Sequence, residues 1–260
     1  MMSEEIVSDL MRAHIYRLAQ RGERMDGRGI EDPRKLTIDR KYVGTAEGSA
    51  RARLGNTDVL VGIKMSTGEP YPDTPDTGVL STSLELVPMA SPTFEAGPPK
   101  PEAIEIARVI DRGIRESKMV NVEKLCIKPK EKVWVLFIDI HALDYDGNLF
   151  DAGSYGAVAA IASTVVPAKA QGVGDDFALP VEHWPVSVTF AKIKDLILLD
   201  PDLDEERMAD ARLTVTTDEN GDIRAMQKGL NGSFSYDEIK RCIETSQRVG
   251  RQVRPMLQGS

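Results

Sequence analysis

The stretch at residues 196–215 places the tightest limit on what this chain can fold into. An apolar run is followed by an acidic segment and then by a run rich in β-branched residues, which predicts two strands joined by a turn. Six carboxylates lie from Asp200 to Asp210, beside a strand end, where catalytic carboxylates are often held. Arg212 counts against such a site, because a guanidinium keeps its proton, repels a divalent cation and pairs with the carboxylates itself. The stretch is therefore interpreted as the frame of an active site without its working centre.

The net charge limits the partners that the chain can have. The 260 residues carry a formal net charge of −8, with a pI near 5.1, which argues against a protein that coats nucleic acid without specificity. A polyanionic partner would have to be bound by a local basic stripe. Cys126 and Cys242 form no metal-binding spacing, and no run nears the roughly 18 apolar residues of a membrane span. We expect a soluble cytoplasmic protein without a signal peptide, folded as one large domain or two smaller ones.

The first part of the chain predicts a helix followed by a sheet. Residues 3–20 have helical periodicity, with Ser3 as the cap and one apolar stripe made of Ile6, Val7, Leu10, Met11, Ile15 and Leu18. A charged turn follows at residues 24–28. Four strand-like segments come next, at residues 35–40, 49–54, 57–65 and 79–87, and a Gly55-Asn56 turn joins the second to the third. These segments predict one sheet that begins antiparallel.

The helix predicted over residues 101–118 carries three arginines on one face. Arg108, Arg112 and Arg115 fall at i, i+4 and i+7, opposite an apolar face made of Ala103, Ile106, Val109, Ile110 and Ile114. One interpretation is a solvated surface on which Glu105 and Asp111 pair with the arginines. The other is a stripe that holds the phosphates of a strand laid across the helix, since arginine offers planar, multidentate donors. Spacing alone leaves both interpretations open.

The middle of the chain predicts a buried strand and a helix of small residues. Residues 132–143 run apolar and predict a central strand. The sequence Asp-Ala-Gly-Ser-Tyr-Gly at residues 151–156 then opens a helix predicted over residues 157–166. The Gly153-Ser154 pair at this helix start has two interpretations. It is either an anion site made of free backbone N–H groups or a plain cap with close helix packing.

The last third predicts a second half built from a sheet and a helix. Residues 171–185 form a linker with glycine, aspartate and proline, in which His183 has no partner. Strands near residues 186–193, 195–200, 212–217 and 223–230 follow, with a hairpin turn at Asn220-Gly221. Ser235 begins a capping box for a last helix that runs to about residue 253. The predicted fold class is therefore α+β, with an N-terminal domain at residues 1–170 and a C-terminal domain at residues 186–260.

Several short motifs, taken together, resemble those of the RNase PH family of phosphorolytic exoribonucleases. The matching run spans about residue 24 to residue 249. It includes Arg-Met-Asp-Gly-Arg at 24–28, Gly-Ser-Ala at 48–50, Gly-Asn-Thr at 55–57, Arg-Val-Ile-Asp-Arg at 108–112, Asp-Ala-Gly-Ser at 151–154 and the acidic turn. Within the family the chain is most similar to the non-catalytic RNase PH-like subunits of the archaeal exosome. The resemblance implies an RNase PH-like fold of two mixed sheet-and-helix halves.

The resemblance also indicates what a phosphorolytic centre would need here. Inorganic phosphate attacks the last phosphodiester of RNA, so cationic and backbone donors must bind the phosphate, and carboxylates must place a metal or move a proton. In active members an arginine follows the Gly-Ser turn, and two aspartates stand six positions apart after the last strand's turn. This chain has Tyr155 at the first position, and Glu206 and Arg212 at the other two. We expect no catalytic residue, no bound metal, no cofactor and no phosphorolysis by this chain alone.

The partners that the resemblance implies are a homologous catalytic subunit and RNA. In the archaeal exosome three copies of such a subunit alternate with three catalytic siblings in a hexameric ring, on which RNA-binding cap proteins dock. The resemblance implies that Arg108 and Arg112 bind single-stranded RNA entering the neighbour's site, while Arg115 either does so or pairs with Asp111. Two alternatives remain. One is a plain scaffold, and the other is a self-sufficient phosphate- or metal-dependent exoribonuclease that uses Asp200, Asp202, Asp204, Glu206 and Asp210.

Overall fold

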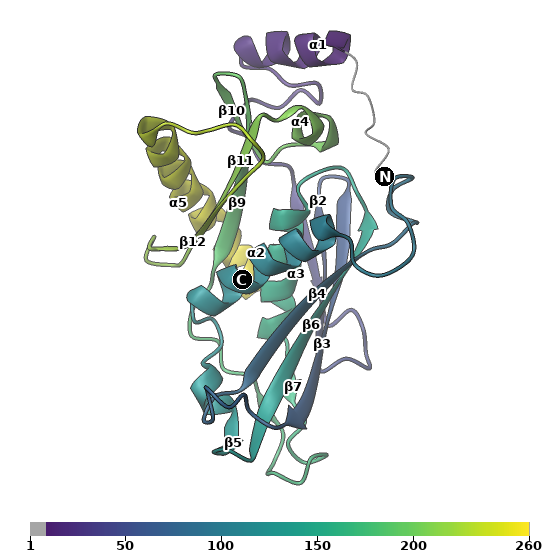
Figure 1. Cartoon of the computed structure of the whole chain (residues 1–260), viewed down its shortest axis with the longest axis vertical. Coiled ribbons are helices and arrows are strands. Elements are labelled where there is room, and N and C mark those ends of the chain that lie inside the picture. Colours follow the sequence, from purple (N-terminus) through teal and green to yellow (C-terminus); the bar gives the residue numbers. More distant parts are fainter. Residues whose placement is uncertain (1–8, 260) are drawn as a thin grey trace.

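The buried apolar residues of the first helix lie in its C-terminal half. The structure, a computed structural model, describes residues 9–259 and begins with helix α1 (Asp9–Gln20) (Figure 1). The predicted helix start, with Ser3 as its cap, lies outside these residues. Ile15 and Ala19 are buried in a small apolar cluster with residues of the second sheet and helix α4 (Leu203–Met208), whereas Leu10 is 79% exposed. The prediction of one apolar stripe along the whole helix is therefore wrong at Leu10.

The N-terminal sheet has the strand order β1-β2-β3-β6-β4, with β5 paired to β6. Neighbouring strands are antiparallel, except that β4 and β6 are parallel. The first three strands form the predicted antiparallel beginning, and Gly55 takes a left-handed backbone at the predicted turn. The fourth predicted strand is separated from the third, because β6 lies between them. The strands are β1 (Leu36–Arg40), β2 (Gly48–Leu54), β3 (Thr57–Gly68), β4 (Val79–Leu86), β5 (Cys126–Lys128) and β6 (Lys132–Asp144).

The C-terminal sheet is antiparallel throughout, with the order β10-β9-β11-β12. Its strands are β9 (Val186–Ile193), β10 (Leu196–Leu199), β11 (Ala211–Thr217) and β12 (Ile223–Gly229), all close to the predicted bounds. The acidic segment between β10 and β11 folds as the short helix α4 instead of the predicted turn, because Asp202 and Glu205 form a capping box. The capping box predicted at Ser235 is confirmed, and it opens helix α5 (Tyr236–Gln258).

Helices α2 (Pro101–Glu116) and α3 (Leu149–Ala162) lie between the two sheets, and each contacts strands of both (Figure 1). Small residues let α3 approach its neighbours closely. A Cβ atom added at Gly153 would lie 2.7 Å from Ile110, and one added at Gly156 would lie 2.8 Å from Val61. The result is one hydrophobic core that contains residues of both halves of the chain.

The start of α3 differs from the prediction, and the difference removes a predicted site. Asn148 caps the helix from a left-handed backbone (φ 55°), with its side chain accepting a hydrogen bond from the Asp151 N–H, so α3 begins eight residues earlier than predicted and ends at Ala162. The Gly153-Ser154 pair therefore lies inside the helix, where backbone N–H groups are already hydrogen-bonded. The interpretation of this pair as an anion site with free N–H groups is wrong.

The predicted linker contains local structure of its own. A two-residue strand β8 (Phe177–Ala178) pairs with β7 (Val165–Val166). The prediction that His183 has no partner is wrong, because its Nδ1 lies 2.7 Å from Glu219 Oε1. The domain boundaries at residues 170 and 186 stay a prediction. Both cysteines are free thiols, and no helix within residues 9–259 has the length and apolar character that crossing a membrane requires.

Candidate nucleic-acid interface and the acidic centre

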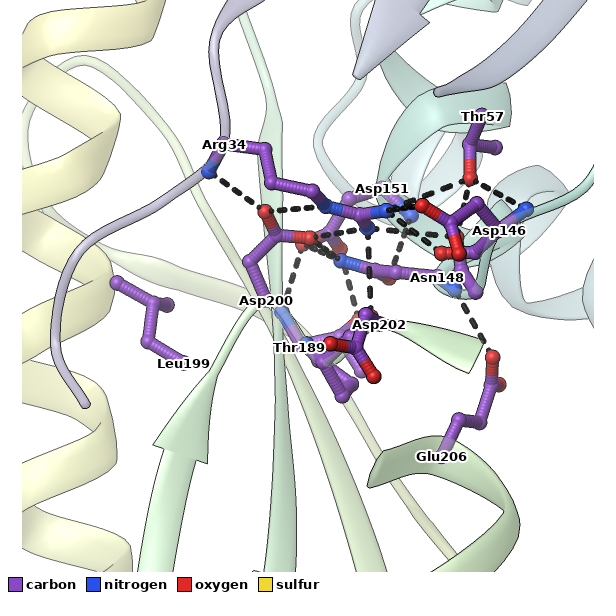
Figure 2. Close-up of polar contacts among 12 residues, drawn as sticks. Arg34, Thr57, Asp146, Asn148, Asp151, Thr189, Leu199, Asp200, Asp202 and Glu206 are labelled. Atoms are coloured by element: carbon purple, nitrogen blue, oxygen red, sulfur yellow. Dashed lines mark hydrogen bonds and ion pairs between the residues drawn. The ribbon is translucent and has the colours of Figure 1, made fainter. Parts of the chain in front are cut away.

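Asp200, at the end of β10, is the centre of a buried ion pair between the two halves of the chain (Figure 2). Only 2% of Asp200 is exposed. Its carboxylate accepts hydrogen bonds from Arg34 Nε at 3.0 Å, from Arg34 Nη2 at 2.7 Å and from the Arg34 backbone N–H at 2.8 Å. The Asn148 amide donates another at 2.7 Å. Burial acts to raise the pKa of Asp200, but the bonds and charge of Arg34 outweigh it and hold the pKa below its ordinary value.

Asp151 lies beside this ion pair and is held by neutral donors. Its Oδ2 accepts hydrogen bonds from the Asn148 amide at 2.8 Å and the Thr189 N–H at 3.0 Å, and its Oδ1 accepts one from the Thr189 hydroxyl at 2.7 Å (Figure 2). Burial raises the pKa of Asp151 to about 7, with the charge of Asp200 adding to this effect against the hydrogen bonds. Because burial favours a neutral carboxyl, this group changes its charge near neutral pH.

The remaining carboxylates of the acidic segment are used within the protein. Glu205 is 1% exposed and forms a buried ion pair with Arg24, whose Nε donates to Glu205 Oε1 at 2.8 Å. Asp202 caps α4, and Asp210 accepts a hydrogen bond from Arg12 at 2.7 Å. Within residues 9–259 the one grouping of His, Cys, Asp or Glu side chains spaced to hold a metal is His183, Asp218 and Glu219, which belongs to another part of the chain. The acidic segment therefore does not gather its carboxylates into a metal site.

Arg212 lies beside two glutamates, and only one of them, Glu206, belongs to the acidic segment. Its Nη2 donates to Glu105 Oε1 at 2.6 Å, and its Nη1 is 3.9 Å from Glu206 Oε1. The guanidinium carbon lies 4.0 Å from the centroid of the Phe150 ring, within range of a cation–π contact. Glu206 also accepts a hydrogen bond from the Asn148 N–H at 2.9 Å. A fixed positive charge therefore stands between the two glutamates.

Tyr155, at the position where active members carry an arginine, belongs to the core. The residue is 3% exposed, and its hydroxyl donates to the Ser187 carbonyl oxygen at 2.8 Å. Burial raises the pKa of this phenol well above its ordinary value, so it stays neutral. A neutral phenol bound to a backbone carbonyl therefore supplies no positive charge for a phosphate.

The three arginines of α2 line a groove of about 750 Å³, together with Thr82 and Gln227. Arg115 is paired with Asp111 at 3.0 Å, and Arg112 Nη1 donates to the side-chain oxygen of Gln227 at 3.4 Å. Arg108 is exposed and has no hydrogen-bond or ion-pair partner within residues 9–259. The groove therefore presents two exposed guanidinium groups that no carboxylate of the described chain neutralises.

This pairing pattern corrects one sequence interpretation. The interpretation as a merely solvated stripe predicts that Glu105 and Asp111 pair with its arginines. Asp111 pairs with Arg115 only, and Glu105 is taken by Arg212 from the other half of the chain. Spacing along α2 could not show this, since 107 positions separate Glu105 from Arg212.

Two domain models of one known protein family match this chain. Residues 32–167 match domain 1 of the 3′ exoribonuclease family, RNase PH, and residues 183–249 match domain 2. The chain belongs to the RNase PH family. The resemblance and the α+β fold class predicted from the sequence are thereby confirmed.

Relatives of this RNase PH-family chain include components of archaeal exosomes. It is 51% identical over 252 residues to the exosome complex component Rrp42 of Thermoplasma acidophilum, covering 97% of this chain and 96% of the relative. It is 52% identical over 262 residues to the Rrp42 component of Thermococcus kodakarensis, with the same coverage. Its structure matches a chain of the "archaeoglobus fulgidus exosome with RNA bound to the active site" with a TM-score of 0.92, at 47% identity, covering 95% of this chain and 97% of that one.

Proposed function

We propose that this chain is the non-catalytic RNase PH-like subunit of an exosome ring that degrades RNA from its 3′ end. The proposal is supported by the likeness to Rrp42 components over nearly the whole chain. It rests above all on Arg212, whose guanidinium lies against Glu105 and Glu206 where a phosphorolytic centre would need a metal or a proton carrier. Chemistry then takes place in a homologous catalytic subunit, and this chain shapes that neighbour's site.

The ring is proposed to contain three copies of this chain alternating with three copies of the catalytic subunit, with RNA-binding cap proteins on one face. The ring and the caps come from the resemblance to archaeal exosomes, whereas the proposed cytoplasmic location comes from the features of the sequence. In a closed alternating ring every copy of this chain has the same neighbours, so the α2 groove of each copy can serve the site of an adjacent catalytic subunit.

Within the ring, Arg108 and Arg112 are the proposed RNA-binding residues. Both are exposed on one face of α2 and line the same groove. A guanidinium binds phosphate with two parallel N–H donors, which suits the backbone of single-stranded RNA and carries no sequence preference. Arg115 contributes less, because Asp111 already neutralises it. The acidic remainder of the chain keeps RNA binding confined to the groove.

We expect the double substitution Arg108→Ala with Arg112→Ala to lower the affinity of the assembled ring for single-stranded RNA at least about tenfold. The reason is that a hydrogen bond to a charged group contributes about 1.5–3 kcal/mol. The slope of log K against log salt should fall in magnitude by about 1.4, since each lost phosphate contact on a single strand contributes about 0.7. Fluorescence anisotropy of a labelled oligoadenylate, in buffer without phosphate so that phosphorolysis cannot run, measures both quantities.

The matched control is Arg241→Ala with Arg251→Ala, which removes two exposed arginines from α5 and changes the net charge equally. The control should leave the RNA affinity and the salt slope within about twofold of the wild-type values. Salt screens the interaction between RNA and exposed charges that lie farther away than the Debye length. If the control and the α2 variant lose equal RNA affinity, the two groove arginines act only through the general surface charge and form no specific RNA site. An unchanged affinity in the α2 variant, with the ring intact, would leave this chain a plain scaffold.

A further inference from the structure

Glu105 is placed where it could interfere with RNA binding. It stands three residues before Arg108 on α2, and both side chains line the groove. Side chains three positions apart on a helix are neighbours, so a free Glu105 carboxylate could pair with the Arg108 guanidinium or repel an approaching phosphate. In the structure this carboxylate is instead bound by Arg212 at 2.6 Å.

Residues of α3 and β12 also contact the Arg212 guanidinium. The ring of Phe150, from α3, lies on it at 4.0 Å. Gly229 of β12 is the cross-strand partner of Arg212, and a Cβ atom there would lie 2.7 Å from Arg212 Nη2. The Arg212 side chain is only 10% exposed. An aromatic ring and a glycine therefore fix the guanidinium beside Glu105.

The surroundings of this guanidinium are strongly acidic. Glu206 lies 3.9 Å from it, and Glu102 stands one helical turn before Glu105 on α2. Burial raises the pKa of Glu102, and the neighbouring charges of Glu206 and Glu105 add to this effect, which indicates a negative local potential. The positive charges of Arg212 and Lys100 act against this effect at Glu102, and Arg212 is the one that binds Glu105, the glutamate that lines the groove.

We propose that Arg212 is a positioning residue for RNA binding, which neutralises Glu105 and thereby keeps Arg108 free for a phosphate of the strand. The inference rests on the proposed role of Arg108 and Arg112 and deepens it. It gives Arg212 a function beyond the loss of a catalytic carboxylate, since its guanidinium neutralises a carboxylate, Glu105, that lines the same groove as Arg108.

The test is a double-mutant cycle in the full chain, assembled with its homologous catalytic subunit and titrated with labelled oligoadenylate in phosphate-free buffer. Arg212→Met keeps an apolar stem on Phe150 and removes the charge. It should weaken RNA binding about fivefold, because one uncompensated carboxylate within several ångströms of a phosphate contributes about 1 kcal/mol at an exposed site. Adding Glu105→Gln should restore the affinity to within about twofold of wild type, while Glu105→Gln alone should change it little.

The rescue separates electrostatic positioning from a merely structural role. A loss in Arg212→Met that Glu105→Gln does not restore would overturn the inference, as would an unchanged affinity in Arg212→Met. If instead Arg108→Ala with Arg112→Ala leaves binding unchanged, the proposed RNA-binding role of these two arginines itself fails. Should Arg212→Met not fold, Gly229→Ala displaces the guanidinium without deleting it, and the same partial loss with the same rescue is expected.

Discussion

Replacing Asp200 with alanine is expected to lower the free energy of unfolding by about 3–5 kcal/mol, the effect of removing one partner from a buried ion pair. The substitution leaves the Arg34 guanidinium, whose side chain is 6% exposed, without the carboxylate that accepts its hydrogen bonds; the carboxylate of Asp146 lies farther away, at 4.0 Å. It also leaves the Asn148 amide without the acceptor that lies at 2.7 Å. Because Arg34 precedes β1 and Asp200 follows β10, the substitution removes a buried ion pair that connects the two halves of the chain.

Urea or guanidinium chloride denaturation of the purified chain measures this change. The matched control is Asp39→Ala, which removes an aspartate from an exposed ion pair with Arg53 in which both side chains are more than two-fifths exposed. Exposed pairs contribute about 0–1 kcal/mol, so the control should change stability by no more than that. A similar small change for both variants would mean that the Arg34–Asp200 pair does not stabilise the fold.

The pH dependence of stability should contain a contribution from Asp151. Its carboxyl binds a proton more tightly in the folded protein, where its pKa is raised to about 7, than in the unfolded chain, where an aspartate has a pKa near 3.9. The resulting stabilisation is fully present below about pH 4 and is lost as the pH rises through about 7. Between pH 5 and pH 8 the wild-type protein should therefore lose about 3 kcal/mol through this group.

Asp151→Asn should remove this loss. The asparagine oxygen can accept the hydrogen bonds from Asn148 and the Thr189 N–H, and its amide can donate to the Thr189 hydroxyl, which lies 2.9 Å from Thr214 Oγ1. The free energy of unfolding is measured by denaturant unfolding at pH 5 and at pH 8 for both proteins. The difference between variant and wild type should be more favourable to the variant at pH 8 than at pH 5. Asp39→Asn, an exposed control, should follow the wild type. A variant that parallels the wild type at both pH values would assign the pH dependence to other groups.

The order and type of most elements could be predicted because they depend on local pattern. Strands β9 and β11 alternate or run apolar, turns at Gly55 and Gly221 take left-handed backbones, and Ser235 caps α5 as its spacing with Glu238 predicts. The beginning of α3 could not be predicted in this way. Asn148 starts it from a left-handed backbone, inside a segment that looks like a turn by composition.

The candidate site was predictable in its charges but not in its pairings. The arginine face of α2 and the conflict between Arg212 and a metal site follow from residue type and spacing. The Arg34–Asp200 pair does not, because its members are 166 positions apart and nothing near Arg34 marks it as buried. A buried arginine in a segment without helical or strand periodicity leaves no local signal, so three-dimensional structure was needed to find it.

The most direct test of a non-catalytic subunit is to incubate the purified full chain with single-stranded RNA, inorganic phosphate and Mg²⁺ and to measure nucleoside diphosphate release. The chain alone should release none above the protein-free control, and release should begin when the homologous catalytic subunit is added. The contradicting result is release by the chain alone that Glu206→Gln abolishes, since that would place a working carboxylate beside Arg212.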